Sequence, residues 1–251
     1  MGSEMDFIKI DYTGRMKDGG VFDTTCKETA EKEGILNSNR VYKPMTVIVG
    51  EKQVIEGLDE ALAKMKVGEE REVEIPPEKA YGKRDPARVN LVPAKIFKKE
   101  KVNPFPGMPI EIDGMHGRVQ TVAGGRVRVD FNHEFAGKTL VFKVKVVEKA
   151  EDDNEKAKYL VEKSFEDSND FSINLAGKKL CVKLSDKAYK DRNLLVRKAS
   201  LSAEAFKYLK VSEVEFSEVW KNPESVVKKE LEKDAGKEKP KKASTKAEDK
   251  K

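Results

Sequence analysis

Side chains that commonly carry nucleophilic or metal-binding chemistry are scarce in this chain. Its only histidines are His116 and His133, too few for a metal site built on histidine, and His133 is better explained as a structural loop residue. The two cysteines, Cys26 and Cys181, lie far apart and have neither metal-binding nor redox spacing. No local Ser-His-Asp motif occurs, and no glycine-rich phosphate loop precedes a helix. We therefore expect a function that needs no metal and no cofactor.

Aromatic and aliphatic residues, in contrast, recur in short motifs on both sides of an interruption. The motif Ala80-Tyr81-Gly82 stops in the middle of a domain, and its natural continuation at residues 139–144, which includes Phe142, follows more than fifty residues later. This spacing is explained if a second domain is inserted into a loop of the first. The motifs before the interruption are Tyr12-Thr13-Gly14, Asp18-Gly19, Phe22-Asp23 and Val54-Ile55-Glu56-Gly57-Leu58.

Taken in this order, and closed by the strand that contains Phe142, these motifs resemble the FKBP-type peptidyl-prolyl cis/trans isomerases. The interruption after Tyr81 matches the place where SlyD-like bacterial chaperones and archaeal FKBP isomerases carry an insert-in-flap domain. A third segment and a lysine-rich end make the chain most similar to the long archaeal form. The resemblance covers roughly residues 6–149, and the interpretation of the remainder rests on architecture alone.

The resemblance implies an apolar pocket for proline, with a few polar groups that hold the substrate backbone. Asp23 and the Tyr81 hydroxyl would orient that backbone, and the Ile55 backbone N–H would donate to a substrate carbonyl. Phe135 would replace an aliphatic flap residue at the rim. Each such side chain, taken alone, is better explained as part of a core, so the interpretation depends on the whole ordered set. The residues assigned to the pocket are Tyr12, Phe22, Val54, Ile55, Leu58, Tyr81 and Phe142.

A pocket of this kind can catalyse rotation about a peptide bond without a nucleophile. The barrier to rotation is roughly 18–20 kcal/mol, and the uncatalysed event at proline takes about 10–100 s. An acceleration of about five decades corresponds to roughly 7 kcal/mol of barrier reduction. Because water favours the planar, polarised amide, a dry apolar cleft favours the twisted amide, whose charge separation is smaller.

The expected fold class is α+β, with an FKBP-like antiparallel sheet wrapped on one helix, an inserted small all-β domain and a C-terminal α+β domain. The first domain is discontinuous and comprises residues 1–86 and 132–150. The insert comprises residues 87–131 and the C-terminal domain residues 151–227. A disordered lysine-rich tail is expected for residues 228–251. Three such parts are compatible with a chain of 251 residues.

Periodicity predicts the main elements of the first domain. Residues 6–12 and 71–76 alternate as strands should. Apolar positions at helical spacing predict a helix over residues 55–65, with Gly68 placed to end it in a left-handed cap. The polar stretch at residues 24–42 is expected to be irregular and to bulge outward.

The insert is expected to contain short strands, with Gly124 and Gly125 forming a tight hairpin turn. Before these strands lies an apolar, proline-containing segment that is expected to be too irregular for a helix. Its side chains Phe97, Phe105 and Met108 either form a cleft that holds unfolded chains or fill the insert's own core. A second site near the isomerase pocket would raise the effective concentration of substrate without tight binding at either site.

In the C-terminal domain we expect a helix capped by Asn154, a hairpin, a strand at residues 194–196, a helix at residues 202–209 and a last strand at residues 214–220. The aromatic residues of this domain either fill its core or form a surface through which two copies dimerise. They are Phe206, Tyr208, Phe216 and Trp220.

Composition sets the remaining expectations. Charged residues make up 38% of the chain and aromatic residues 7%, a balance typical of a very soluble protein with small cores. The chain has no run of about 18 apolar residues and no signal-peptide pattern, so we expect a cytoplasmic protein without membrane interactions. The segment after Lys233 cannot bury enough apolar surface to fold. It is expected to be solvated, with nucleic acid or ribosome contact as the alternative.

The leading hypothesis, by resemblance, is a peptidyl-prolyl isomerase that is also a folding chaperone. Its partners would be unfolded or nascent polypeptides and proline-containing peptides. The alternatives are a binding module that docks a partner's proline motif without catalysis, and a ribosome-associated adaptor.

Overall fold

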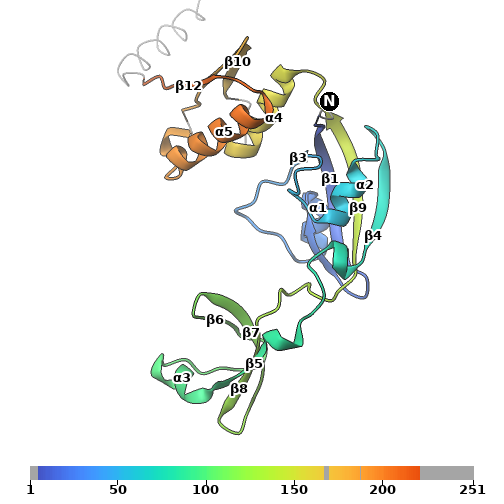
Figure 1. The fold of residues 1–251 in the computed structure, drawn as a ribbon, viewed down its shortest axis with the longest axis vertical. Coiled ribbons are helices and arrows are strands. Elements are labelled where there is room, and N and C mark those ends of the chain that lie inside the picture. Colours follow the sequence, from blue (N-terminus) through green and yellow to red (C-terminus); the bar gives the residue numbers. More distant parts are fainter. Residues whose placement is uncertain (1–4, 167–169, 187, 221–251) are drawn as a thin grey trace, which may run out of the picture.

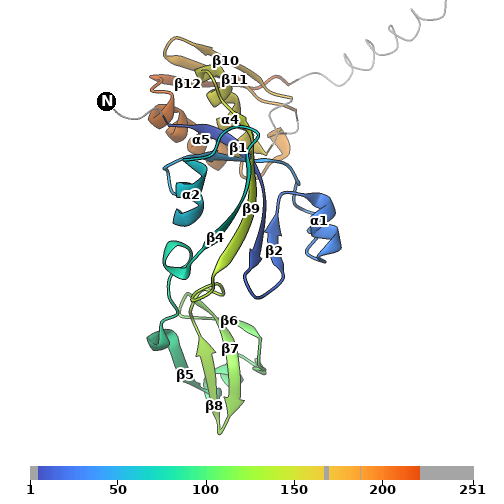
Figure 2. The same ribbon diagram turned by 90° about the vertical axis from the view of Figure 1, so that its right-hand side faces the viewer.

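The computed structural model describes residues 5–166, 170–186 and 188–220. Three sheets of five, four and three strands, together with a few helices, confirm the expected α+β class. In two perpendicular views the five-stranded sheet lies between the other two (Figures 1 and 2). The tail expected for residues 228–251 lies outside the described residues.

The five-stranded sheet joins the two segments that flank the interruption. Its order is β2-β1-β9-β4, with β3 also paired to β1, and all pairs are antiparallel. Strand β9, which follows the interruption, pairs with both β1 and β4. The strands are β1 (Phe7–Met16), β2 (Val21–Thr24), β3 (Met45–Ile48), β4 (Glu70–Ile75) and β9 (Leu140–Lys149).

One helix, α2 (Glu56–Leu62), packs against this sheet. Leu58 and Leu62 are buried together with Ile10 and Val144, because alternate side chains of each strand point to the same face. The helix is shorter than the predicted one and ends at Leu62, so the predicted cap by Gly68 is wrong. Gly68 instead adopts φ 83° in the turn before β4 and donates its N–H to the Val146 carbonyl at 2.8 Å.

A second helix, α1 (Lys27–Lys32), lies in the segment that was expected to be irregular. Ala30 is fully buried, while Glu28 in the first turn and Lys32 in the last turn complement the helix dipole. Six residues span fewer than two turns, so they show little periodicity. The expectation of an irregular stretch is therefore wrong for these six residues.

The four-stranded sheet is formed by residues between Tyr81 and β9. Its order is β5-β8-β7-β6, and all pairs are antiparallel. Gly124 and Gly125 turn the chain from β7 into β8 with φ of 56° and 71°, a conformation that favours glycine. Two short 3-10 turns, η1 (Pro77–Lys79) and η2 (Pro86–Arg88), precede it. The strands are β5 (Val89–Pro93), β6 (Pro109–Ile112), β7 (Met115–Ala123) and β8 (Arg126–Asp130).

This part of the chain is not all-β, because α3 (Ala94–Lys99) lies between β5 and β6. Phe97 on this helix is buried against Val119, Val127 and Val129 of the sheet. The expectation that the segment from Phe97 onward is too irregular for a helix is wrong for residues 97–99. Burial of one ring in tertiary contacts stabilises a turn of helix that its local sequence does not specify.

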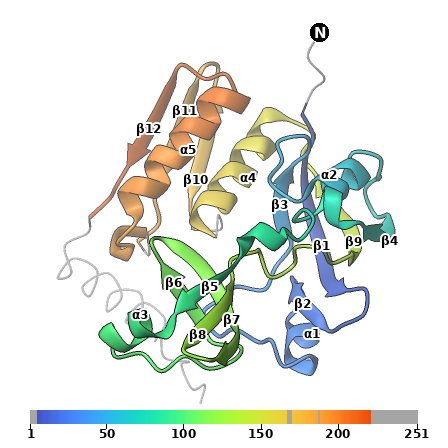
Figure 3. The ribbon, with the colours of Figure 1, turned by 60° about the horizontal axis from the view of Figure 1, so that its bottom comes forward.

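The three-stranded sheet has the order β10-β11-β12, with β10 antiparallel and β12 parallel to β11. Leu160 of α4 and Leu201 of α5 are both fully buried in the core of this part, and the two helices lie side by side over the sheet (Figure 3). The elements are α4 (Asp153–Phe165), β10 (Ser172–Ala176), β11 (Lys179–Lys183), η3 (Ala188–Lys190), α5 (Leu194–Tyr208) and β12 (Glu213–Ser217).

Two expectations for this part are wrong. The helix cap is Asp152 rather than Asn154, because the Asp152 carboxylate accepts the Glu155 N–H at 2.8 Å. Residues 194–196 form the first turn of α5 rather than a strand, although their types favour strands. The whole helix buries Leu201 and Ala205 against its neighbours, and this packing outweighs the preference of three residues.

The first and third sheets share a hydrophobic core. Phe7 and Ile48 of the five-stranded sheet are buried in one cluster with Leu160 of α4, and the Phe7 ring meets the Tyr208 ring edge-on at 5.7 Å. The Lys9 ammonium pairs with the Glu162 carboxylate of α4 at 3.0 Å. These contacts make the two parts a single packed body.

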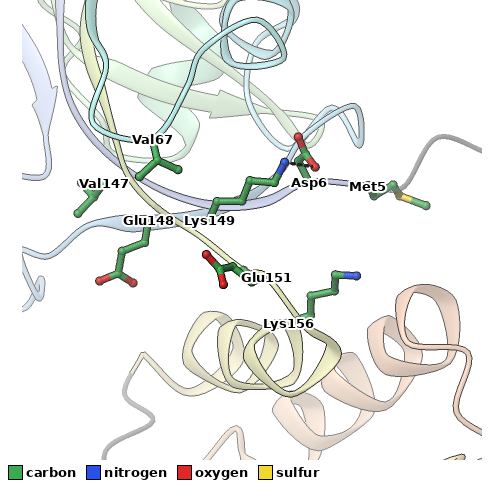
Figure 4. Close-up of a pocket in the computed structure, with 9 residues that line it drawn as sticks. Met5, Asp6, Val67, Val147, Glu148, Lys149, Glu151 and Lys156 are labelled. Atoms are coloured by element: carbon green, nitrogen blue, oxygen red, sulfur yellow. Dashed lines mark ion pairs between the residues drawn. The ribbon is translucent and has the colours of Figure 1, made fainter.

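Where β9 leads into α4, polar contacts hold the junction (Figure 4). The Lys149 ammonium pairs with the Asp6 carboxylate at 2.7 Å. The Glu155 carboxylate accepts the Glu151 N–H at 2.8 Å. A hollow at this junction contains no aromatic side chain. It therefore does not resemble the expected proline pocket. Within the described residues, no helix combines the length and the apolar character that a membrane span requires.

Candidate functional site

A continuous row of ring contacts joins aromatic residues from both sides of the interruption. The Tyr12 and Phe142 ring centroids are 6.1 Å apart, and Phe142 meets Phe22 edge-on at 5.8 Å. Phe22 packs on Phe135 at 4.4 Å, and Phe135 lies 5.5 Å from Tyr81. The four aromatic residues that sequence motifs assigned to one pocket are thus brought together, with Phe135 between Phe22 and Tyr81. We call these five residues the aromatic row.

Aliphatic residues from α2 and the loop before it lie beside the aromatic row. Leu58 is buried in the same cluster as Tyr12 and Phe142, while Val54 and Ile55 pack on this cluster and remain half-buried. Ile55 is the extended residue that precedes α2. Within the described part of the chain, the Ile55 backbone N–H has no hydrogen-bond acceptor, so it is free to donate to a ligand.

A buried carboxylate holds the loop that carries Val54 and Ile55. Asp59 accepts the backbone N–H groups of Gly50 and Lys52 at 2.9 and 3.4 Å. The loop is therefore pinned to the helix that supplies Leu58, which fixes the apolar side of the site.

Gly14 lets the aromatic rings approach the sheet. A Cβ atom at this position would lie 2.8 Å from both the Phe22 and the Phe142 ring, closer than real Cβ contacts allow. Only glycine can therefore occupy this position of β1 without displacing one of the two rings.

Polar groups meet at the Tyr12 end of the row. The Tyr12 hydroxyl donates to the Asp23 carboxylate at 2.6 Å. Burial, together with the hydrogen bond to Asp23 and its charge, raises the pKa of Tyr12 to about 12, so the phenol stays neutral at physiological pH.

Arg40 is a member of this polar group that the motifs did not identify. Its guanidinium forms an ion pair with Asp23 and lies within 3.4 Å of the Tyr12 hydroxyl. Arg40 belongs to the polar loop after α1, where no local pattern distinguishes one charged residue from another. Asp23, which the resemblance assigned to the substrate backbone, thus already has two partners on the protein.

Tyr81 lies at the opposite end of the row and is 39% exposed. Partial burial and the charges of Asp23 and Glu134 raise its pKa. The Tyr81 hydroxyl makes no hydrogen bond to another described residue and is free to bind a ligand.

His133 extends the row by stacking on Tyr81, with ring centroids 4.1 Å apart and planes within 4°. Its Nδ1 atom accepts the Phe135 N–H at 3.2 Å. The loop role expected for His133 is therefore present. The stack on Tyr81 is an additional contact that the sequence did not predict.

The three further predicted residues, Phe97, Phe105 and Met108, are not part of the aromatic row. Phe97 is buried in the core of the four-stranded sheet, Met108 packs on that core, and Phe105 is 60% exposed. Phe97 and Met108 line a hollow of about 440 Å³ in this part of the molecule, together with Ile96, Val102, Ile110 and Ile112.

A second cleft adjoins the Tyr81 end of the aromatic row. It has a volume of about 780 Å³ and combines residues of the four-stranded sheet with residues of the segments that lead into and out of it. His133 links the cleft to the row, because it lines the cleft and stacks on Tyr81. Four cationic side chains and two carboxylates face the cleft, namely Arg84, Arg88, Arg118, Lys138, Asp130 and Glu134.

No group of three or more potential metal ligands occurs among the described residues. Of the two cysteines, Cys26 is exposed and Cys181 half-buried, and neither forms a disulfide.

Two family models match this chain. One, described as "FKBP26, IF domain", matches residues 90–135, and the other, described as "FKBP26_C-terminal", matches residues 153–221. The first match covers most of the four-stranded sheet, and the second begins with α4.

Named relatives also match the chain. The chain is 42% identical over 141 residues to the "Short-type peptidyl-prolyl cis-trans isomerase" of Methanocaldococcus jannaschii, an alignment that covers 56% of this chain and 89% of that protein. It is 34% identical over 116 residues to the "FKBP-type peptidyl-prolyl cis-trans isomerase SlyD" of Helicobacter pylori, an alignment that covers 45% of this chain and 63% of that protein. It is 31% identical to the "Probable FKBP-type 16 kDa peptidyl-prolyl cis-trans isomerase" of Pseudomonas fluorescens, an alignment that covers 56% of this chain and 87% of that protein. The chain therefore belongs to the FKBP-type peptidyl-prolyl cis-trans isomerases, as a SlyD-like member.

Proposed function

We propose that the aromatic row and the aliphatic residues beside it catalyse cis/trans isomerisation of the bond before proline in peptides and unfolded chains, without a cofactor. The observation that carries this proposal is the continuous ring contact from Tyr12 to Tyr81 across the interruption. It supports a single water-poor surface on which a proline ring can pack.

The chemistry follows from removing water around the amide. The planar amide is polarised and gains more from hydration than the twisted amide, so an apolar surface lowers the barrier to rotation. In this proposal Tyr12, Phe22, Leu58 and Phe142 form that surface, and no covalent bond is made or broken.

The proposed polar contacts lie at the margins of the surface. The Ile55 N–H and the Tyr81 hydroxyl, both free of partners within the described residues, would hold substrate carbonyl groups. Asp23 would orient the substrate together with Arg40, to which it is already paired. These contacts fix the substrate backbone on both sides of the rotating bond.

A peptide isomerisation assay on the whole protein tests this proposal. Tyr81→Ala should lower kcat/KM at a smaller cost in stability than a core substitution, because the Tyr81 side chain is 39% exposed. Phe142→Ala should lower kcat/KM and also cost about 3–5 kcal/mol of stability, because the ring is 6% exposed. If the wild-type protein binds a proline peptide normally but does not accelerate its isomerisation, the chain is a binding module and the catalytic proposal is wrong.

We further propose that residues 87–131 form an inserted domain that holds unfolded polypeptides. The hollow beside Phe97 and Met108 and the exposed side chain of Phe105 support an apolar binding surface there.

Replacing residues 87–131 by a short glycine-serine linker should spare turnover of a tetrapeptide and reduce the refolding rate of a whole protein. Phe105→Ser is the matched point variant, because its exposed side chain contributes little to the core. Equal losses on peptide and protein would contradict this division of labour.

The remaining proposals concern association. We propose that two copies dimerise through the part of the chain from α4 to β12. There Leu195 is 80% and Trp220 75% exposed, and Phe206 is also exposed, whereas Tyr208 and Phe216 pack on the core. Leu195→Asp should convert the dimer to a monomer in analytical ultracentrifugation, and a monomeric wild type would refute the proposal. Contact of the tail with nucleic acid or ribosomes stays a prediction.

A further inference from the structure

The cleft next to Tyr81 carries an excess of positive charge. Its four cationic side chains, Arg84, Arg88, Arg118 and Lys138, face two carboxylates, those of Asp130 and Glu134. We propose that this cleft binds acidic side chains close to the proline, so that the protein favours acidic segments of its polypeptide substrates. The inference rests on the proposed isomerase function and adds a substrate preference to it.

Partners within the protein account for only part of this charge. The Arg84 guanidinium pairs with Asp130, whose carboxylate also accepts from Asn132 at 2.7 Å and from Gln120 at 3.2 Å. Although burial raises the pKa of Asp130, hydrogen bonds from Asn132 and the Arg84 charge hold it below its ordinary value. Arg84 and Asp130 therefore neutralise each other at physiological pH.

The second carboxylate is held loosely. The Glu134 carboxylate lies 3.9 Å from the Arg118 guanidinium, and both side chains are about 61% exposed. Pairs of this kind contribute little free energy and are readily exchanged for other partners. Arg118 can therefore contact a carboxylate that a ligand brings.

Two cations have no carboxylate partner within the described residues. Arg88 and Lys138 both face the cleft and are exposed. The nearest described contacts of the Lys138 ammonium are the Met16 sulfur atom at 3.4 Å and the Phe135 ring, whose centroid lies 5.8 Å away. Within the part of the chain that the structure describes, the cleft thus offers two unneutralised positive charges.

The position of Lys138 connects this charge to the proposed site of rotation. The Lys138 ammonium lies 5.8 Å from the centroid of the Phe135 ring, at the edge of the aromatic row. Because an extended chain advances about 3.3–3.6 Å per residue, a proline packed on the row beside Phe135 would place a residue about two positions away near Lys138. A carboxylate about two residues from the proline would therefore reach Lys138, and one further along would reach Arg88 or Arg118.

An acidic polypeptide fits the cleft better than a nucleic acid does. The cleft runs into the aromatic row through His133, and the row is the surface on which we place proline. A phosphate backbone would satisfy the cations but would bring no proline to that surface.

Matched peptides test the inference. Each contains the same alanine-proline core, with Glu, Gln or Lys placed two residues before or two residues after the proline. At low salt, the Glu peptide whose position gives the faster turnover should have a kcat/KM about two- to fivefold higher than the Gln peptide with the same position. The corresponding Lys peptide should have a lower kcat/KM than the Gln peptide. The preference should vanish near 0.5 M salt, where exposed charges are screened over about 4–5 Å.

Charge variants identify the cleft as the source of the preference. The double variant Arg88→Gln/Lys138→Gln should turn over the Gln peptide like the wild type and lose the preference for Glu. The variant Arg88→Glu/Lys138→Glu should reverse the preference, so that the Lys peptide is turned over faster than the Glu peptide. The matched control, Lys64→Gln/Lys66→Gln, changes two exposed lysines beyond the end of α2 and should leave the preference intact.

Three results would overturn the inference. The first is equal turnover of Glu and Gln peptides by the wild type, and the second is a preference for Glu that survives in the Arg88→Gln/Lys138→Gln variant. The third is displacement of the Glu peptide by a single-stranded oligonucleotide at a lower concentration than by polyglutamate. If no peptide is isomerised, the proposed function fails. Fluorescence anisotropy with the same labelled peptides then decides the inference, because the Glu peptide must still bind more tightly than the Gln peptide at low salt.

Discussion

The Phe22 and Phe135 rings lie with their centroids 4.4 Å apart and their planes inclined by 39°. Phe22 belongs to β2, before the interruption, and Phe135 to the segment that returns from it. Rings in direct contact leave no room for a proline ring between them. The face of Phe22 that Phe135 covers therefore becomes accessible only when Phe135 moves.

Phe135→Ala should lower the KM for a short proline peptide, because a site that is covered in most molecules binds with an affinity reduced by its accessible fraction. If Phe135 covers the site in half to nine-tenths of the molecules, KM should fall about two- to tenfold. Steady-state kinetics on a tetrapeptide measures the change, with Leu91→Ala as a control on an exposed apolar residue of β5. A raised KM at unchanged kcat would mean that Phe135 only adds a binding contact.

Gly14→Ala should lower kcat/KM by displacing the two rings that lie within 2.8 Å of the new methyl group. Overpacking of this kind typically costs about 1–3 kcal/mol of stability, so urea unfolding should be recorded with the kinetics. Gly20→Ala is the matched control, because a Cβ atom there meets nothing within 4 Å. Similar kinetics for the two variants would show that the ring positions at Gly14 do not matter for turnover.

Tyr12→Phe should cost about 1–3 kcal/mol of stability at neutral pH, because it removes the hydroxyl that donates to the charged Asp23. The pKa of Tyr12 is raised to about 12, above the value of about 10 expected in an unfolded chain, so the neutral form is favoured by folding. This contribution is fully present below pH 10 and is lost as the pH rises toward 12.

Free energies of unfolding for the wild type and Tyr12→Phe, measured from pH 8 to pH 12, test this pH dependence. Comparing the two proteins cancels the titration of the other tyrosines. The difference between them should be constant below about pH 10 and shrink above it. A difference that stays constant to pH 12 would show that the Tyr12 hydroxyl is not held by Asp23 in solution.

Removal of the residues after Ala150 should destabilise the five-stranded sheet, because Phe7 and Ile48 are buried against the third part of the chain. Exposing one or two such side chains costs about 2–4 kcal/mol. Calorimetry on the full chain should show one unfolding transition for the five-stranded sheet and the part after Ala150 together. Phe7→Ala supplies the control, since it should cost less in the truncated protein than in the full chain. Equal costs in both would contradict a shared core.

Local patterns predicted the strands and the helix that frame the site. Alternation along β1 and β4 and the helical spacing of α2 each depend on residues close in sequence, and these elements are present with shifted ends. Short elements were missed, as at α1 and α3, because six residues carry too little periodicity. The error at Leu194 has another cause, since the packing of α5 outweighs the strand preference of three residues.

By itself, the sequence determined the order of the aromatic motifs and the existence of an interruption, because both can be read along the chain. Only the tertiary structure decided that Arg40 pairs with Asp23, that Phe135 covers Phe22 and that His133 stacks on Tyr81. Each of these contacts joins segments that are distant in sequence and that the folded chain brings together. No local sequence pattern specifies which side chains then meet.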